Sequence, residues 1–128
     1  MPKTILIADD EQPVINAYAR VLKNQGFQVI SALTTEQAME TLERTHVDLL
    51  LLDLAIPTSN GLELLRKLRS DSRFAKLPVI VQSGFAERVS NELLPLHPVR
   101  VFTKPVPLDD LLWTIRDALD TKTRPLPH

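Results

Sequence analysis

The sequence contains no cysteine, carries almost no net charge and has no long apolar run. Without cysteine, disulfides, thiolate metal sites and thiol nucleophiles are excluded. Fifteen Lys and Arg residues against sixteen Asp and Glu residues give a net charge of −1, so we expect no general electrostatic attraction to nucleic acid or to an anionic membrane. The longest apolar run, Leu49–Leu52, is far shorter than the ~20 residues of a membrane span. The apolar stretch Ile5–Ala8 is too short for a signal peptide, so we expect a soluble, cytoplasmic protein.

The composition favours one folded domain. The 128 residues are 44% hydrophobic and 24% charged, and a chain of this size buries about 70% of the surface that its unfolded form exposes. We expect residues 1–120 to form the domain. Residues 121–128, which include Pro125 and Pro127, are expected to form a tail or the start of a linker.

Short apolar runs recur along the chain and have the length of β-strands. Three of them, beginning at Ile5, Leu49 and Val79, lack polar alternation, which is typical of strands buried on both faces of a parallel sheet. A run from Val99 alternates, which predicts one wetter face. The runs are Ile5–Ala8, Phe27–Ile30, Val47–Leu52, Val79–Val81 and Val99–Phe102.

Segments with helical periodicity follow these runs. The first is expected to bury one stripe of side chains and to end at Gly26, where a left-handed cap is needed. Thr34 and Gln37 form a capping box that opens the second, with Ala38 and Leu42 facing inward. The expected stripe of the first helix is Val14, Ala17, Tyr18, Val21 and Leu22.

The remaining three helices are predicted in the second half of the chain. The fourth, from about Phe85 to Leu94, is expected to be short because Pro95 and Pro98 interrupt it. Pro107 suits the start of the fifth. The inward residues are expected to be Leu62, Leu65 and Leu68 in the third helix and Leu108, Leu111, Leu112, Ile115 and Leu119 in the fifth. Five strand–helix units in succession predict an α/β fold with right-handed crossovers and helices on both faces of a parallel sheet.

Charged and hydroxyl side chains follow four of the five predicted strands. Because ligands bind at the carboxyl ends of the strands in such sheets, we expect these side chains to lie at one rim. Three carboxylates close together repel one another unless a cation compensates, and Mg²⁺ prefers oxygen ligands. A lysine suits a phosphoryl oxygen, and a carboxylate beside both is arranged to attack phosphorus. The residues are Asp9, Asp10, Asp53, Ser83 and Lys104.

A plainer interpretation is that the acidic residues cap helices and that Lys104 is a surface charge. The coincidence of all five residues at strand ends argues against it.

These residues resemble those of the response-regulator receiver domains of two-component signalling, over about Thr4 to Leu119. The acidic pair Asp9-Asp10, the segment Asp53–Pro57 with Gly61, the pair Ser83-Gly84 and the pair Lys104-Pro105 carry the resemblance. It implies a flavodoxin-like, doubly wound sheet of five strands in the order 2-1-3-4-5 with five helices.

The resemblance also implies site roles. Asp53 would accept a phosphoryl group from a phosphohistidine, and Ser83 and Lys104 would contact its oxygens. Asp9, Asp10, Asp53 and the backbone carbonyl of Ala55 would hold Mg²⁺, Asp10 directly and Asp9 mainly through water. The implied partners are a histidine kinase or histidine phosphotransfer protein, and a downstream effector or a second copy of the chain at the face of the fourth helix, fifth strand and fifth helix.

The sequence departs from the family pattern at several positions. Val101 stands where the family often has an aromatic switch residue, and Phe102 is expected on the opposite strand face. His97-Pro98 replaces the usual small residues before the fifth strand. Ala55 and Phe85, both apolar, would flank the approach of a hydrolytic water to phosphorylated Asp53.

Two other functions compete with a phosphoacceptor module that is not a turnover enzyme. One is a phosphatase or hydrolase with an Asp nucleophile, but Ala55 stands where a general acid is commonly found. The other is a pseudo-receiver that binds partners without phosphorylation, which Val101 would suit.

Two residues are candidates for partner surfaces. Trp113 is expected to point outward from the fifth helix, either as part of a partner surface or packed in part against the fourth. Ile15 is expected to be exposed beside the acidic pair, where it would contact a kinase's helical phosphotransfer domain or be a stray surface residue. The three histidines share no metal-binding spacing, and we expect structural or surface roles for them: His46, His97 and His128.

Overall fold

The computed structural model describes residues 2–54, 61–84 and 86–120. Strands and helices alternate throughout these residues, as the apolar runs predict. The elements are β1 (Thr4–Ala8), α1 (Gln12–Asn24), β2 (Gln28–Ala32), α2 (Thr35–Arg44), β3 (Leu49–Leu54), α3 (Gly61–Arg69), β4 (Val79–Ser83), α4 (Ala86–Leu93), the short 3-10 helix η1 (Leu94–Leu96), β5 (Arg100–Thr103) and α5 (Leu108–Leu119).

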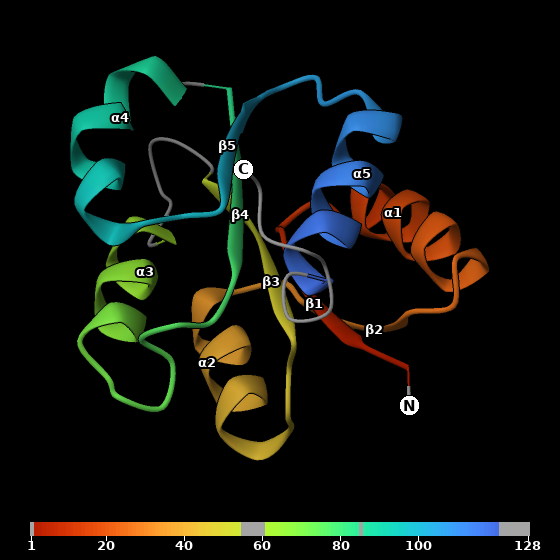
Figure 1. The fold of residues 1–128 in the computed structure, drawn as a ribbon, viewed down its shortest axis with the longest axis horizontal. Helices are drawn as coiled ribbons and strands as arrows, with labels where there is room; N and C mark the ends of the chain where they lie inside the picture. Colours follow the sequence, from red (N-terminus) through yellow and green to blue (C-terminus); the bar gives the residue numbers. More distant parts are fainter. Residues whose placement is uncertain (1, 55–60, 85, 121–128) are drawn as a thin grey trace.

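Within the described residues the strands form one parallel sheet in the order β2-β1-β3-β4-β5. Helices α1 and α5 cover one face, and α2, α3 and α4 cover the other (Figure 1). This is the flavodoxin-like, doubly wound arrangement that was expected. The strand order reverses beside β1, so the ends of β1 and β3 lie next to each other where such folds bind ligands.

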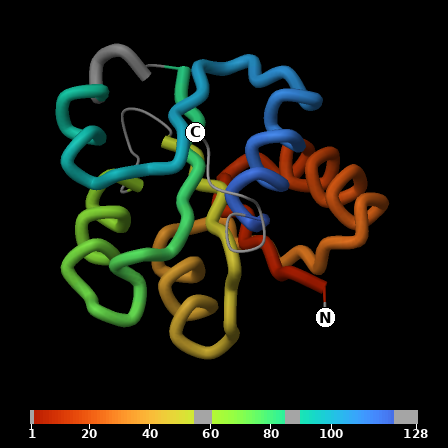
Figure 2. The backbone as a smooth tube through the Cα atoms, in the orientation of Figure 1, coloured from red at the N-terminus to blue at the C-terminus, as the bar shows by residue number. Residues whose placement is uncertain are grey.

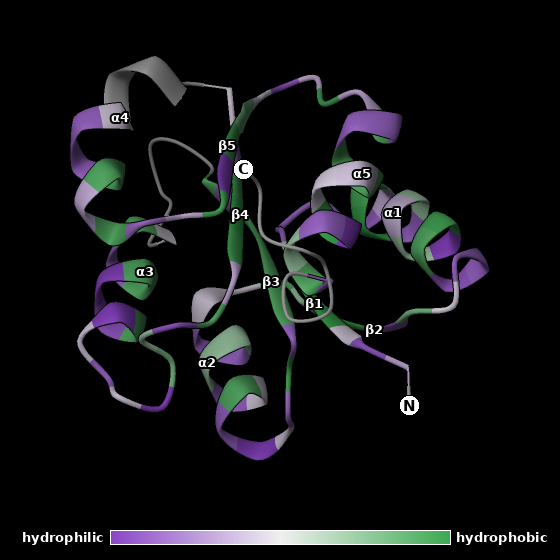
Figure 3. Ribbon diagram, viewed as in Figure 1, coloured by the Kyte–Doolittle hydropathy of each residue, from purple (hydrophilic) through white to green (hydrophobic). Residues whose placement is uncertain are grey.

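The core consists of two apolar layers, one on each face of the sheet. Successive residues of β3 alternate between them: Leu50 and Leu52 pack towards α2, α3 and α4, and Leu49 and Leu51 towards α1 and α5. Figure 3 shows hydrophobic residues along the strands and hydrophilic residues on the outward sides of the helices. Because both faces are covered, β1, β3 and β4 are buried at every position.

The predicted helix ends are confirmed for α1 and α2. Gly26 follows α1 with a φ of 94°, a conformation that a side chain would strain. Thr34 Oγ1 accepts a hydrogen bond from the Gln37 backbone N–H at 3.1 Å. The Gln37 side chain accepts from the Leu33 N–H at 2.9 Å, so it closes the box one residue earlier than the usual motif. Ala38 and Leu42 face inward as expected.

The predicted buried stripe of α1 is wrong by about one residue. Ile15, expected to be exposed, is 2% exposed and packs between α1 and the sheet, whereas Val14 is half-buried and Ala17 is exposed. Tyr18 and Leu22 belong to both the predicted and the observed stripe. The observed stripe is displaced by one residue, which corresponds to a rotation of the helix by about 100°. A buried Ile15 cannot serve as the docking residue that the sequence suggested.

Smaller corrections concern α3 and α5. Leu65 and Leu68 are buried as expected and Leu62 packs against the core, but Leu64 was missed, and Leu108 at the start of α5 is exposed. Helix α4 ends at Leu93, and Pro95 lies in the η1 turn, which packs against α3 before the chain enters β5 (Figure 2).

Candidate functional site

The site lies at the carboxyl ends of β1, β3, β4 and β5, and the strand register determines which side chains are neighbours. Ala8 is level with Leu52, so Asp9 is level with Asp53. Asp53 in turn pairs with Gln82 on β4. Ser83 ends β4, and Lys104 follows β5. The structure therefore brings the sequence-predicted Asp9, Asp10, Asp53 and Lys104 together.

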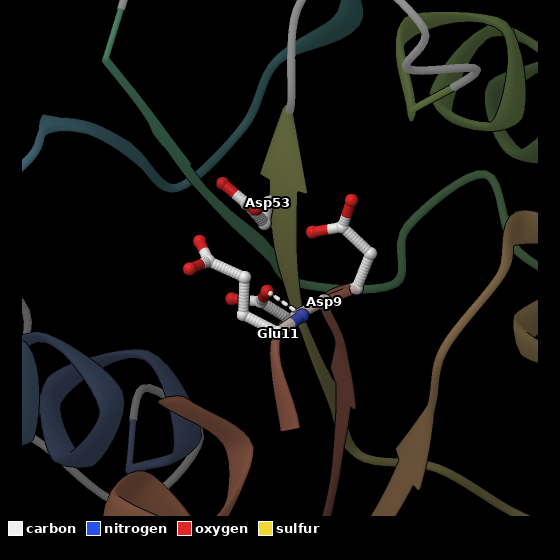
Figure 4. Close-up of side chains that lie close together, drawn as sticks. Asp9, Glu11 and Asp53 are labelled. Atoms are coloured by element: carbon white, nitrogen blue, oxygen red, sulfur yellow. Dashed lines mark hydrogen bonds between the residues drawn. The ribbon is translucent and has the colours of Figure 1, made fainter. Parts of the chain in front are cut away.

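Four carboxylates form the acidic part of this site. One oxygen from each of Asp9, Asp10, Glu11 and Asp53 lies within 4.8 Å of the others. Figure 4 shows Asp9, Glu11 and Asp53 gathered beside the end of β3. Hard divalent cations bind sets of carboxylate oxygens of this kind, so the cluster could hold a metal ion.

Asp9 is a buried carboxylate, 4% exposed, with one oxygen in use. Its Oδ1 accepts a hydrogen bond from the Glu11 backbone N–H at 2.9 Å, drawn dashed in Figure 4. Its Oδ2 is buried without a hydrogen-bond partner among the described residues. Burial, reinforced by the charges of Asp53 and Glu11, raises the pKa of Asp9 from 3.8 to about 6, although the Glu11 N–H and Lys104 oppose the shift. A buried oxygen with no partner fits a bound cation.

Asp53 is 7% exposed and forms an ion pair with Lys104, whose Nζ lies 2.7 Å from Asp53 Oδ1. Burial raises the pKa of Asp53 despite this cation, and Asp10 and Glu11 add to the rise. Burial would lower the pKa of Lys104, but its hydrogen bond and charge interaction with Asp53 outweigh burial and raise it. The pair therefore holds a charged carboxylate in a poorly solvated place.

Glu11 was not predicted from the sequence as a site residue. Its carboxylate belongs to the acidic cluster, and its Oε1 lies 4.0 Å from Lys104 Nζ. The run Asp9-Asp10-Glu11 was the available signal.

Other predicted site residues are placed as follows. Ser83 is fully buried at the end of β4, and Asp10 is exposed at the rim. Ala55 and Phe85 lie outside the described residues. The peptide bond between Lys104 and Pro105 is cis.

Three further residues considered in the sequence, Val101, Phe102 and Trp113, are also placed by the structure. Val101 packs on the α2–α4 side of the sheet and Phe102 on the α1–α5 side, as strand alternation predicts. Trp113 is 64% exposed on α5. His46 pairs with Asp48 at 2.9 Å, far from the acidic cluster in the fold. His128 lies outside the described residues.

None of the helices in the described part of the chain is both long and apolar enough to cross a membrane.

Comparison with known proteins gives consistent relatives. The chain is 36% identical to the phosphate regulon transcriptional regulatory protein PhoB of Pseudomonas aeruginosa over 85 residues, which are 66% of this chain and 37% of that protein. It is 24% identical to the polar-differentiation response regulator DivK of Brucella ovis over 120 residues, covering 93% of this chain and 98% of DivK. The chain thus spans well under half of PhoB and nearly all of DivK.

A solved structure agrees with the fold. A CheY-like response regulator receiver domain protein from Methanospirillum hungatei superimposes with a TM-score of 0.87 at 28% identity, covering 96% of this chain and 98% of that one. The family model described as "Response regulator receiver domain" matches residues 5–116. This match extends from β1 into α5 and takes in Asp9, Asp53 and Lys104, and the chain belongs to the response regulator receiver domain family, a signalling family of two-component systems.

Proposed function

We propose that this receiver domain is a phosphoacceptor and that Asp53 takes the phosphoryl group from a phosphohistidine of a histidine kinase or histidine phosphotransfer protein in the cytoplasm. The observation that carries the proposal is the buried Asp53 carboxylate, held 2.7 Å from Lys104 and beside three other carboxylates. Such a carboxylate is a nucleophile with a fixed cation next to it.

The transfer forms an acyl phosphate at Asp53. A carboxylate oxygen attacks phosphorus, the phosphorus–nitrogen bond of the phosphohistidine breaks, and the imidazole leaves with the electron pair and takes up a proton. Lys104 and Ser83 would contact the phosphoryl oxygens and stabilise the charge that they carry. The module undergoes this reaction itself and has no turnover substrate.

A divalent cation, proposed to be Mg²⁺, would be held by Asp9, Asp10, Asp53 and the backbone carbonyl of Ala55. The clustered carboxylates and the unpartnered Asp9 Oδ2 fit such an ion. When bound, Mg²⁺ neutralises carboxylate charge and polarises phosphoryl oxygens.

Phosphorylation is proposed to alter the surface formed by α4, β5 and α5, which would bind a downstream effector or a second copy of the chain. The exposed Trp113 supports this surface, because tryptophan is enriched at the centres of interfaces. Beryllofluoride, a mimic of the phosphoryl group, tests this surface. If it promotes binding of the effector or of a second copy of the chain, sedimentation should show an increase in mass, and Trp113→Ala should abolish that increase.

Acetyl phosphate with Mg²⁺ tests the phosphoacceptor assignment. Mass spectrometry of the reduced acyl phosphate should place the modification on Asp53, and Asp53→Asn should prevent it. Asp48→Asn, which changes a half-buried aspartate outside the cluster, is the matched control and should react like the wild type. Modification at Asp9 or Asp10, or equal labelling of Asp53→Asn, would refute the assignment.

A further inference from the structure

A buried amide lies beside Asp53. Gln82 pairs with Asp53 on one side and with Phe102 on the other, in the central part of the parallel sheet. Paired residues of parallel strands point to the same face, and Phe102 packs towards α1 and α5. Gln82 and Asp53 therefore project side by side on that face.

The Lys104–Asp53 ion pair lies on the same face of the sheet as Gln82. Lys104 follows β5, and its Nζ lies 2.7 Å from Asp53 Oδ1 on this face of β3. Strands β3 and β5 are separated by β4, a distance of about 10 Å at ordinary strand spacing. The Lys104 side chain must therefore cross β4 near Gln82 and Ser83. Gln82 is therefore the β4 residue level with Asp53 on the face that carries the Lys104–Asp53 pair.

A hydrogen bond from a side chain of α1 orients the Gln82 amide, but only one of the two polar atoms of this amide has a partner among the described residues. Its Oε1 accepts a hydrogen bond from the Tyr18 hydroxyl at 3.0 Å. Its Nε2 is buried and makes no hydrogen bond within the described residues, and the whole side chain is 1% exposed. Because Gln82 is level with Asp53 and the Tyr18 hydroxyl bonds to its amide, both side chains lie at the edge of the site.

Packing of the sheet does not require an amide at this position. The preceding residues of β4 are Val79, Ile80 and Val81, and another apolar side chain would fill the same layer without burying an unpaired donor. A donor held in place by Tyr18 and left without an acceptor is suited to a group that arrives at the site.

We propose that Gln82 is a positioning residue of the phosphoacceptor site, with Nε2 donating a hydrogen bond to an oxygen of the phosphorylated Asp53 side chain. Tyr18 holds the amide so that Nε2 faces the site. The inference rests on the proposed function. Phosphorylation adds three oxygens beside Asp53, and each can accept more than one contact, so an acceptor remains for the amide besides the contacts proposed for Lys104, Ser83 and the cation. The Nε2 donor makes no hydrogen bond within the described residues of the unmodified site.

Beryllofluoride with Mg²⁺, a mimic of the phosphoryl group, tests the proposal by NMR. In the wild type the side-chain N–H resonances of Gln82 should move downfield and exchange more slowly with solvent when the mimic binds. Gln82→Met keeps the side chain's length but removes the donor, and should weaken beryllofluoride affinity about tenfold, the effect of one charge-assisted hydrogen bond. Tyr18→Phe should weaken it less.

Gln25→Met is the matched control, because Gln25 is exposed at the end of α1. It should leave the affinity unchanged. Denaturation of each variant measures its stability separately from its affinity. If Gln82 had only a structural role, Gln82→Met would be less stable, but the Gln82 side-chain resonances of the wild type would not move when the mimic binds. Unmoved Gln82 resonances, or equal affinities of Gln82→Met and wild type, would overturn the role of Gln82 while leaving the function intact. A wild-type protein that binds no beryllofluoride would overturn both.

Discussion

The Lys104 side chain reaches from the end of β5 across β4 and places its Nζ 2.7 Å from Asp53 Oδ1. Through this contact a fixed cation offsets the burial of the Asp53 carboxylate. The pKa of Asp53 is nevertheless raised, because burial is the largest influence on it. A group whose pKa is raised on folding contributes stability at pH values below its unfolded pKa, and this contribution is lost as the pH rises through the folded pKa.

Removing the cation should therefore raise the pKa of Asp53 further. In Lys104→Gln, carbon-13 NMR should show the Asp53 carboxyl titrating at higher pH than in the wild type, and the free energy of unfolding should fall more steeply as pH rises through that pKa. Lys76→Gln removes an exposed lysine and is the control. An identical Asp53 titration in the wild type and Lys104→Gln would contradict the ion pair.

Asp9→Asn should stabilise the metal-free protein. The pKa of Asp9 rises from 3.8 to about 6 on folding, so its protonation stabilises the protein below pH 3.8, and this stability is lost between there and about pH 6. The loss amounts to at most about 3 kcal/mol. With chelator at pH 8, urea unfolding should show Asp9→Asn to be more stable than the wild type, and the difference should vanish at pH 4.

Asp10→Asn is the natural comparison, because Asp10 belongs to the same cluster but is exposed. It should change metal-free stability less than Asp9→Asn does. If the cluster binds Mg²⁺ as proposed, added Mg²⁺ should stabilise the wild type against urea, and both variants should lose much of that stabilisation. A destabilised Asp9→Asn at pH 8 would show that its hydrogen bond to Glu11 matters more than the buried charge.

Much of the fold could be predicted from the sequence because the apolar runs are unambiguous. The stretch Leu49–Leu52 has no polar interruption and can only be a buried strand or a buried helix segment, and its length favours the strand. Asp9 and Asp53 follow or end such strands, so their convergence follows from the parallel topology. The strand order itself came from the resemblance to receiver domains.

The rotation of α1 could not be predicted. Val14 and Ile15 are adjacent and both apolar, as are Val21 and Leu22, so two stripes about 100° apart fit the sequence equally well. Packing against the sheet selects the stripe containing Ile15. Gln82 was missed for a related reason: its meaning depends on the register that pairs it with Asp53 and on the approach of Tyr18 from a distant helix.

Asp48 should stabilise the protein in the opposite pH direction from Asp9. Burial alone would raise its pKa, but the hydrogen bond from the Thr4 backbone N–H at 2.8 Å and the contact with His46 at 2.9 Å lower it. Its contribution is therefore present above pH 3.8 and is lost as the pH falls through the lower folded pKa. Asp48→Asn should cost about 1 kcal/mol at pH 7 and nothing at pH 2. His46→Gln, which leaves the Thr4 hydrogen bond in place, should cost less, and equal costs at both pH values would contradict the assignment.

Phosphorylated Asp53 should lose its phosphoryl group slowly. The reason is chemical: Ala55 and Phe85, both outside the described residues, cannot orient a water by hydrogen bonding, and positioning a nucleophile is a major source of rate. The combined variant Ala55→Asn with Phe85→Glu should hydrolyse faster. The decay of phosphoprotein after removal of the donor, with Mg²⁺ present, measures this. A wild-type decay as fast as that of the variant would show that these two positions do not control access of water.

Arg69 should be the most costly charged residue to replace outside the acidic site. Its guanidinium, at the end of α3, donates to the carbonyls of Leu96 at 2.7 Å and Leu77 at 2.8 Å, and to those of Phe74, Ala75 and His97 at longer distances. It thus joins the segment before β4 to the turn before β5, where His97 has a φ of 51°, a conformation that is unfavourable for a non-glycine residue.

Arg69→Met should leave these carbonyls without their donor and lower the free energy of unfolding by about 2–4 kcal/mol. Arg69→Lys should recover only part of the loss, because a single ammonium cannot reach both segments as the planar guanidinium does. Arg73→Met is the matched control: Arg73 lies in exposed ion pairs with Asp71 and Glu43, which contribute little. Urea unfolding ranks the variants, and hydrogen exchange should show the amides of Leu77 and His97 opening faster in Arg69→Met alone. If Arg69→Met costs no more than Arg73→Met, the guanidinium does not hold the two segments together, and the conformation of His97 must be maintained by packing of η1 against α3.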